Sequence, residues 1–148
     1  MSEVSFYNTA ISIPSLAQRT TLAATIIDQE PRAALLKRAL ELVAEDHGGQ
    51  VVDHILDCDS KAIPCLLGVQ TREFPRGIGV VVGPQGEVSF AYDAFGDTAD
   101  WGKRLAGEIQ ANYNAIAVHL ALQVMNLEVQ VRETRTPQGR LIQLEGKV

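Results

Sequence analysis

Cysteine is scarce in this chain, with only Cys58 and Cys65 among 148 residues. Two cysteines do not make the disulfide framework that small secreted domains use to reinforce a small core. The N-terminus also lacks the basic start and the apolar block of a secretory signal. These absences predict a protein of a reducing compartment, and we expect a cytoplasmic localisation.

Long hydrophobic runs and an excess of positive charge are also absent. No stretch approaches the roughly 18 consecutive apolar residues of a membrane span, so we expect no membrane partner. The net charge is −5 and aromatic residues make up only 5% of the chain. Nucleic-acid surfaces rely on clustered cations and often on stacking aromatic side chains, so we expect no nucleic-acid partner.

Motifs that would carry chemistry are missing too. His54, Cys58 and Cys65 are spaced poorly for a zinc site. The aspartates between Asp53 and Asp59 offer oxygen ligands for a divalent cation, but a solvated strand end is the simpler interpretation. No serine or cysteine nucleophile has a recognisable companion. We therefore expect no metal, no cofactor and no catalytic residue, and we favour a protein that is not an enzyme.

The chain does have enough apolar residues, 46% of 148, for one domain with its own core. The stretch Val88 to Leu127 predicts a strand, a short loop and a long helix from Ala99 to about Met125, with Asp97 or Thr98 as a cap. Apolar residues recur along this helix at steps of three and four, which places them on one stripe. They are Leu105, Ile109, Tyr113, Ile116 or Ala117, Leu120 and Val124.

A second helix is predicted to begin near Pro31, because proline is accepted in the first helical turn and Asp28 or Glu30 can cap it. Gly48 and Gly49 should end it, since glycine adopts the left-handed conformation at little cost. The apolar face of this helix consists of Leu35, Leu36, Ala39, Leu40 and Val43.

Strands are predicted from β-branched residues and from turn residues between them. Proline and glycine at the Pro84 to Gly86 turn predict a hairpin. One segment, Thr20–Ile27, also tolerates a helix. The predicted strands are Val4–Ile13 as an edge strand or arm, Thr20–Ile27, Val51–Asp57, Cys65–Thr71, Gly77–Gly83, Glu87–Tyr92, Glu128–Glu133 and Leu141–Leu144.

This order of elements predicts an α+β fold, an antiparallel sheet of five to seven strands with two main helices packed on one face. Residues 1–19 would form an N-terminal arm or edge strand, and residues 20–148 a single α+β domain. The uncovered face would present Val80, Val82, Phe90, Val129 and Val131, or their neighbours if the parity is one residue out. Such a patch predicts a homo-oligomer, with a two-fold dimer favoured.

Several short motifs in order resemble the Ycf35 family, also called the DUF1257 family. They are Thr20-Thr21-Leu22, Gly77 to Val80, Val88 to Asp93 with Gly96, Trp101, Ile109-Gln110 with Tyr113, and Gln138 to Leu144. The resemblance covers about residues 20–144 and implies an opening strand, a central hairpin, a second helix and a closing strand. The chain departs from the pattern in residues 1–19, in a longer Val51 to Phe74 segment and at Asn126. The resemblance implies no catalytic residues.

Two functions follow as hypotheses. The first is a non-enzymatic accessory or assembly module that contacts an unknown protein partner through a sheet face or an edge strand. The second is a small-ligand-binding protein or small enzyme with a pocket near the strand-to-helix loop 92–101, where acidic and aromatic residues meet. The candidate ligand-binding residues are Tyr92, Asp93, Trp101, Gln110 and Tyr113.

Overall fold

The computed structural model describes residues 3–17, 19, 29–96, 99–125, 128–136 and 139–147, with the backbone alone in the last two ranges. The strand predicted over Thr20–Ile27 and the caps predicted at Asp28, Asp97 or Thr98 lie outside the described residues. No helix among the described residues is long and apolar enough to cross a membrane.

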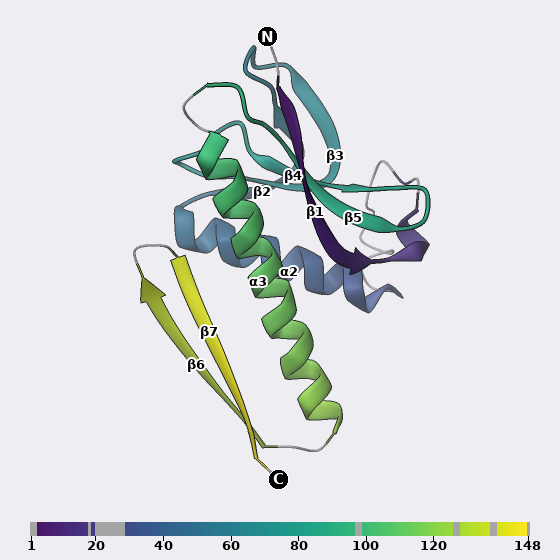
Figure 1. The fold of residues 1–148 in the computed structure, drawn as a ribbon, viewed down its shortest axis with the longest axis vertical. Coiled ribbons are helices and arrows are strands. Elements are labelled where there is room, and N and C mark those ends of the chain that lie inside the picture. Colours follow the sequence, from purple (N-terminus) through teal and green to yellow (C-terminus); the bar gives the residue numbers. More distant parts are fainter. Residues whose placement is uncertain are drawn as a thin grey trace.

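Five strands form one antiparallel sheet in the order β1-β5-β4-β3-β2 (Figure 1). The strands are β1 (Val4–Ser12), β2 (Gln50–Leu56), β3 (Ala62–Gln70), β4 (Ile78–Val82) and β5 (Glu87–Asp93). Two helices, α2 (Pro31–His47) and α3 (Ala99–Val124), contact one another and pack on this sheet, and the short 3-10 helix η1 (Pro14–Leu16) follows β1. The predicted α+β fold is confirmed.

A separate antiparallel hairpin, β6 (Glu128–Thr136) and β7 (Gly139–Lys147), follows α3 and contacts it. Figure 1 shows the hairpin running back beside the helix. The main sheet therefore has five strands rather than seven, because this hairpin pairs only with itself among the described strands.

The ends of α2 follow the predicted signals. The Glu30 carboxylate accepts a hydrogen bond from the Arg32 amide at 3.3 Å, and Pro31 occupies the first turn. Gly48 takes a left-handed conformation with φ of 62°, and its amide donates to the Ala44 carbonyl. The buried positions of α2 are Ala33, Leu36, Ala39, Leu40, Leu42, Val43 and Ala44, which include most of the predicted apolar face.

The core lies between this helix pair and one face of the sheet. Strand alternation brings residues of one parity from each strand onto that face. The sheet contributes Leu67, Val69, Ile78, Val80, Val88, Phe90 and Tyr92, and α3 contributes Leu105, Ala106, Ile109 and Tyr113. Val80 and Phe90 therefore pack beneath the helices, so the prediction that they line the uncovered face was wrong by one residue of parity.

The opposite face is partly covered by the sheet itself. Between Val52 and His54 of β2, the register to β3 moves from Gly68 to Pro64, so β3 has extra residues there and bends. A Cβ atom at Gly79 would lie 2.9 Å from the Cys65 side chain and 3.3 Å from that of Ile55. Glycine at this position lets the bent β2–β3 hairpin approach β4, and Ile55 is fully buried there.

The long helix α3 extends beyond the core. The part of α3 up to Tyr113 buries Leu105, Ile109 and Tyr113, as the periodicity predicts. In the second half of α3 Leu120 is 43% exposed and Val124 is 82% exposed. The expectation that Leu120 is buried was wrong, because the apolar stripe continues past the last turn that the sheet can cover.

Candidate functional site

Asp93, the last residue of β5, holds three chain segments together. Its side chain is fully buried, and its Oδ1 atom accepts hydrogen bonds from the amides of Glu3 and Phe95, each at 2.9 Å. Its Oδ2 atom accepts one from the amide of Cys58 at 2.8 Å. The carboxylate thus fixes the start of β1, the β2–β3 turn and the loop after β5 at one point.

The charge of Asp93 is stabilised in place. Burial alone would raise the pKa of this carboxyl group, but the three amide hydrogen bonds and the nearby Arg76 guanidinium hold its pKa below the ordinary value. Arg76 also donates to the carbonyls of Asp93 and Phe95, and its own carbonyl accepts from the Leu56 amide. Asp93 and Arg76 therefore form a structural junction at this corner of the sheet.

The five predicted ligand-binding residues do not all point to one place. Tyr92 precedes Asp93 on the strand, so it faces the helices, where its ring lies edge-on to Phe74 with centroids 6.4 Å apart. Tyr113 is also buried in this core, and Gln110 is half-buried on α3. Trp101 is half-buried in the first turn of α3, where its ring lies against His47 rather than Asp93. Asp93 lies on the opposite face of the sheet from Tyr92.

A second polar cluster, which the sequence analysis did not predict, surrounds His47 at the end of α2. The His47 Nε2 atom lies 2.6 Å from Glu108 of α3, and its Nδ1 atom lies 3.8 Å from Glu73. The Trp101 ring meets the imidazole edge-on at a centroid distance of 6.0 Å, and Arg104 lies over that ring at 4.5 Å. This His47 cluster ties α2 to α3. No local pattern predicts it, because its members are brought together only by helix packing.

The metal-ligand candidates lie in turns and strands. His54 pairs with Asp53 at 3.0 Å on the surface of β2. Asp57 accepts hydrogen bonds from the amides of Asp59 and Lys61, which is the usual role of aspartate in a turn. Within the described ranges, no group of three or more histidine, cysteine, aspartate or glutamate residues is arranged to hold a metal ion.

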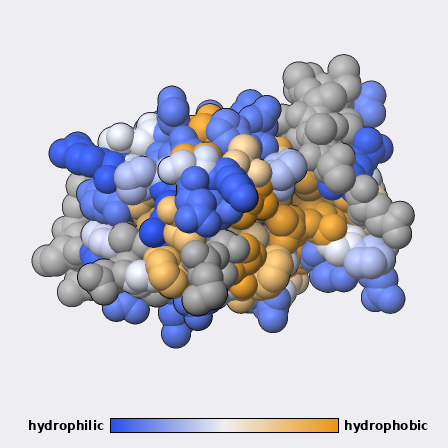
Figure 2. All heavy atoms as spheres, turned by 90° about the horizontal axis from the view of Figure 1, so that it is seen from above, coloured by the Kyte–Doolittle hydropathy of each residue, from blue (hydrophilic) through white to orange (hydrophobic). Residues whose placement is uncertain are grey.

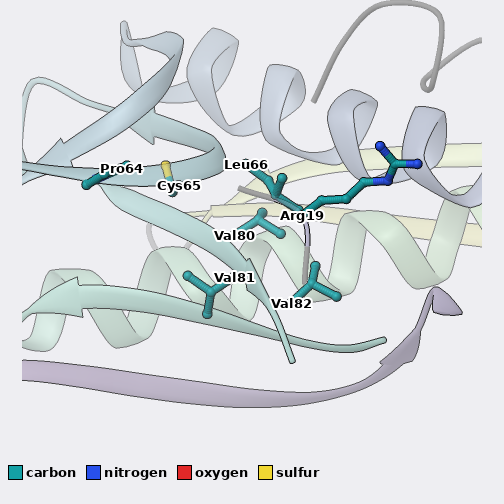
Figure 3. A pocket seen from close by; sticks show the side chains of 7 residues that line it. All are labelled: Arg19, Pro64, Cys65, Leu66, Val80, Val81 and Val82. Carbon is teal, nitrogen blue, oxygen red and sulfur yellow. The ribbon is translucent and has the colours of Figure 1, made fainter. Parts of the chain in front are cut away.

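A cavity of about 430 Å³ opens where β3 bends away from β4 (Figure 3). Its walls are Pro64, Cys65, Leu66, Val80, Val81 and Val82, with Arg19 at the rim. Figure 3 shows the Arg19 guanidinium group pointing away from the three valines. The cavity therefore presents an apolar wall without a directed charge.

Cys65 is the reactive residue type in that wall, and its environment makes it inert. Burial, with a smaller contribution from the charge of Asp53, raises the pKa of the Cys65 thiol to about 12. The thiol is protonated at neutral pH, whereas the thiolate is the nucleophile. Covalent chemistry at this cavity is therefore not supported. Figure 2, which looks down on the molecule from the top of Figure 1, shows a continuous hydrophobic area on the face turned toward the viewer.

Two further surfaces present apolar side chains to solvent. One is the distal α3 surface, formed by Leu120 and Val124, which are 43% and 82% exposed and continue the apolar stripe of the helix. The other is the β1 edge, where Phe6 is 60% exposed and Val4 is 42% exposed. Exposed apolar residues that cluster in this way are typical of protein interaction sites.

Comparison with protein families, with curated proteins and with solved structures finds no match to this chain.

Proposed function

We propose that the protein is a non-enzymatic accessory or assembly module of the cytoplasm, related to the Ycf35 (DUF1257) family. In this proposal it self-associates, most simply as a two-fold dimer, and contacts a further protein partner. The observation that carries the proposal is the distal α3 surface, because burying exposed apolar area is the main driving force for protein association.

The geometry gives less support to a small-ligand site at the loop 92–101. The Asp93 carboxylate already accepts three amide hydrogen bonds, so a ligand would have to displace part of the fold to use it. Tyr92 and Tyr113 are 7% and 8% exposed, which leaves little of either ring for a ligand. The His47 cluster is likewise occupied by its own carboxylates.

Co-purification tests the partner contact. We expect Leu120→Glu combined with Val124→Glu to abolish recovery of a stoichiometric partner from the source cells, because two charges would have to be desolvated at the contact. The matched control is Asn114→Glu combined with Gln123→Glu, which adds equal charge at exposed polar positions of the same helix. Both variants should remain helical by circular dichroism. If no co-purifying protein distinguishes the two variants, the proposed contact through α3 is wrong.

A further inference from the structure

The β1 strand is an open edge of the five-stranded sheet. It pairs with β5 on one side, and no described strand pairs with its other side. Exposed edges invite pairing with another chain, and proteins usually protect them with charged residues, prolines or bulges. The sequence of β1, VSFYNTAIS, contains no charged residue and no proline. Within the described part of the chain, the feature that protects this edge is a register shift near the end of β1, between Asn8 and Ser12.

The hydrogen-bonding pattern identifies which backbone groups are open. The Ala94 amide donates to the Glu3 carbonyl, so the Glu3–Ala94 pair is a hydrogen-bonded pair of this antiparallel ladder. Hydrogen-bonded and non-hydrogen-bonded pairs alternate. In the observed register Val4, Phe6 and Asn8 therefore occupy the non-hydrogen-bonded positions opposite β5. Their N–H and C=O groups point outward from the sheet.

The side chains agree with an interface at the same three residues. Val4 and Phe6 are exposed, on the face of the sheet opposite the helices. Beyond Asn8 the strand departs from regular pairing, where the Thr9 hydroxyl donates to the Val88 carbonyl and accepts from the Ile11 amide. The regular, open part of the edge is therefore Val4 to Asn8, which we call the β1 edge segment.

The opposite edge of the sheet is protected by contrast. The central residues of β2 are Asp53 and His54, and the Asp53 side chain is 92% exposed. A second copy of β2 paired about Asp53 would place two aspartates opposite one another, and like charges directly opposed on neighbouring strands are destabilising. The distribution of charge thus distinguishes the two edges and leaves the β1 edge segment as the one suited to pairing.

We propose that the β1 edge segment pairs with the same segment of a second copy of this chain, antiparallel about a two-fold axis at Phe6. In that register Phe6 lies opposite Phe6 of the second copy, and Val4 lies opposite Asn8. All three residues are outward-facing, so each opposed pair exchanges both of its hydrogen bonds. Each Phe6 ring gains an aromatic cross-strand neighbour, and no charged residues are opposed. The result is one continuous ten-stranded sheet, since each chain contributes five strands.

This inference deepens the self-association in the proposed function and rests on it. It does not use the distal α3 surface. The second copy is favoured over a different extended peptide because an uncharged strand is self-complementary in this register, and a two-fold contact is the commonest closed assembly.

A proline substitution tests the pairing without disturbing the fold. Asn8→Pro removes an amide that faces outward and leaves the hydrogen bonds to β5 in place, so the chain should still fold. We expect light scattering at micromolar concentration to give a dimer mass for the wild type, and 16.1 kDa for Asn8→Pro and for Phe6→Lys. The control Phe95→Lys, at a 40% exposed phenylalanine outside the sheet, should remain dimeric.

Cross-linking tests the register. In a Cys58→Ser background, Phe6→Cys should form a disulfide-linked dimer on oxidation, because opposed residues lie about 5.5 Å apart between Cα atoms, within disulfide reach. Asn8→Cys should not, because its copy in the second chain is offset by four residues, or about 13 Å. Equal cross-linking at both positions would refute the proposed register.

The outcomes separate this inference from the proposed function. A dimer that survives Asn8→Pro and Phe6→Lys overturns the β1 pairing while self-association stands. A monomeric wild type overturns both self-association and the pairing. Neither result depends on the co-purification through α3, which is measured with different variants.

Discussion

At the scale of single residues, Asp93 has the most consequential environment in the described chain. The buried carboxylate accepts hydrogen bonds from three backbone amides in segments far apart in the sequence. Buried donors without an acceptor are costly, so this one side chain decides whether the loop after β5 and the β2–β3 turn can be buried together. Its role is to position backbone, which differs from the ligand-binding role predicted for it.

Replacing Asp93 by asparagine should destabilise the fold by about 1–3 kcal/mol at neutral pH, because an amide oxygen cannot replace two charged acceptors. The pKa of Asp93 is lowered in the folded chain. Its stabilisation is therefore fully present above the unfolded value of about 3.9 and is lost as the pH falls through the folded pKa. Urea unfolding at a series of pH values measures this effect.

The difference between wild type and Asp93→Asn should accordingly shrink on acidification. Asp100→Asn serves as the control, since that carboxylate is exposed in the first turn of α3. A difference that is independent of pH down to full protonation would mean that the charge of Asp93 is not what stabilises the junction.

Residue burial of this kind is only partly predictable from sequence. The sequence places Tyr92 and Asp93 in one candidate site, because the predicted strand ends at Tyr92; in the structure β5 includes Asp93, and alternation puts the two side chains on opposite faces. Aspartate before a loop is usually expected in a solvated turn or at a helix cap. The amides that donate hydrogen bonds to Asp93 become neighbours only after the sheet bends. The His47 cluster also escaped prediction, because His47 and Glu108 become neighbours only when α2 and α3 pack together.

At the scale of elements, local signals predicted the helices well and the strands less well. The Glu30–Pro31 start, the Gly48 end and the periodicity of α3 all reflect interactions within a few residues. The extent of burial along α3 is different, because it depends on how wide the sheet is. β3 begins at Ala62, before the predicted start at Cys65, because its pairing with β2 continues past the bulge.

The two glycines of α3 provide a matched test of how closely the helix approaches the sheet. A Cβ atom at Gly102 would lie 2.3 Å from the Tyr92 ring, whereas one at Gly107 would meet nothing within 4 Å. Gly102→Ala should destabilise by about 1–3 kcal/mol through overpacking. Gly107→Ala should stabilise by up to about 1 kcal/mol, through helix propensity alone.

Denaturant melts of both variants measure this difference. Because the two substitutions make the same chemical change in the same helix, opposite signs isolate the contact with Tyr92. Equal effects at the two glycines would show that the start of α3 does not rest on the Tyr92 ring.

At the scale of the whole molecule, the fold separates a compact half from a projecting half. The sheet, α2 and the first half of α3 form the core, while the second half of α3 and the β6–β7 hairpin extend away from it (Figure 1). The α+β class predicted from the sequence is confirmed, but the apolar patch was assigned to residues such as Val80 that the helices cover. The open surfaces are instead at an edge and at a helix end, which depend on strand order and helix length.

The proposed dimerisation through the β1 edge segment would have a consequence for the stability of the whole chain. A partner that binds only the folded state raises the apparent free energy of unfolding, by about 2.7 kcal/mol when it is present at about 100 times its dissociation constant. The thermal midpoint of the wild type should therefore rise by several degrees as its concentration is increased. Phe6→Lys should unfold at a midpoint that does not depend on concentration, while Phe95→Lys should follow the wild type. Scanning calorimetry at several concentrations makes the comparison. A concentration-independent wild-type midpoint would place the edge strand in solvent in the folded protein.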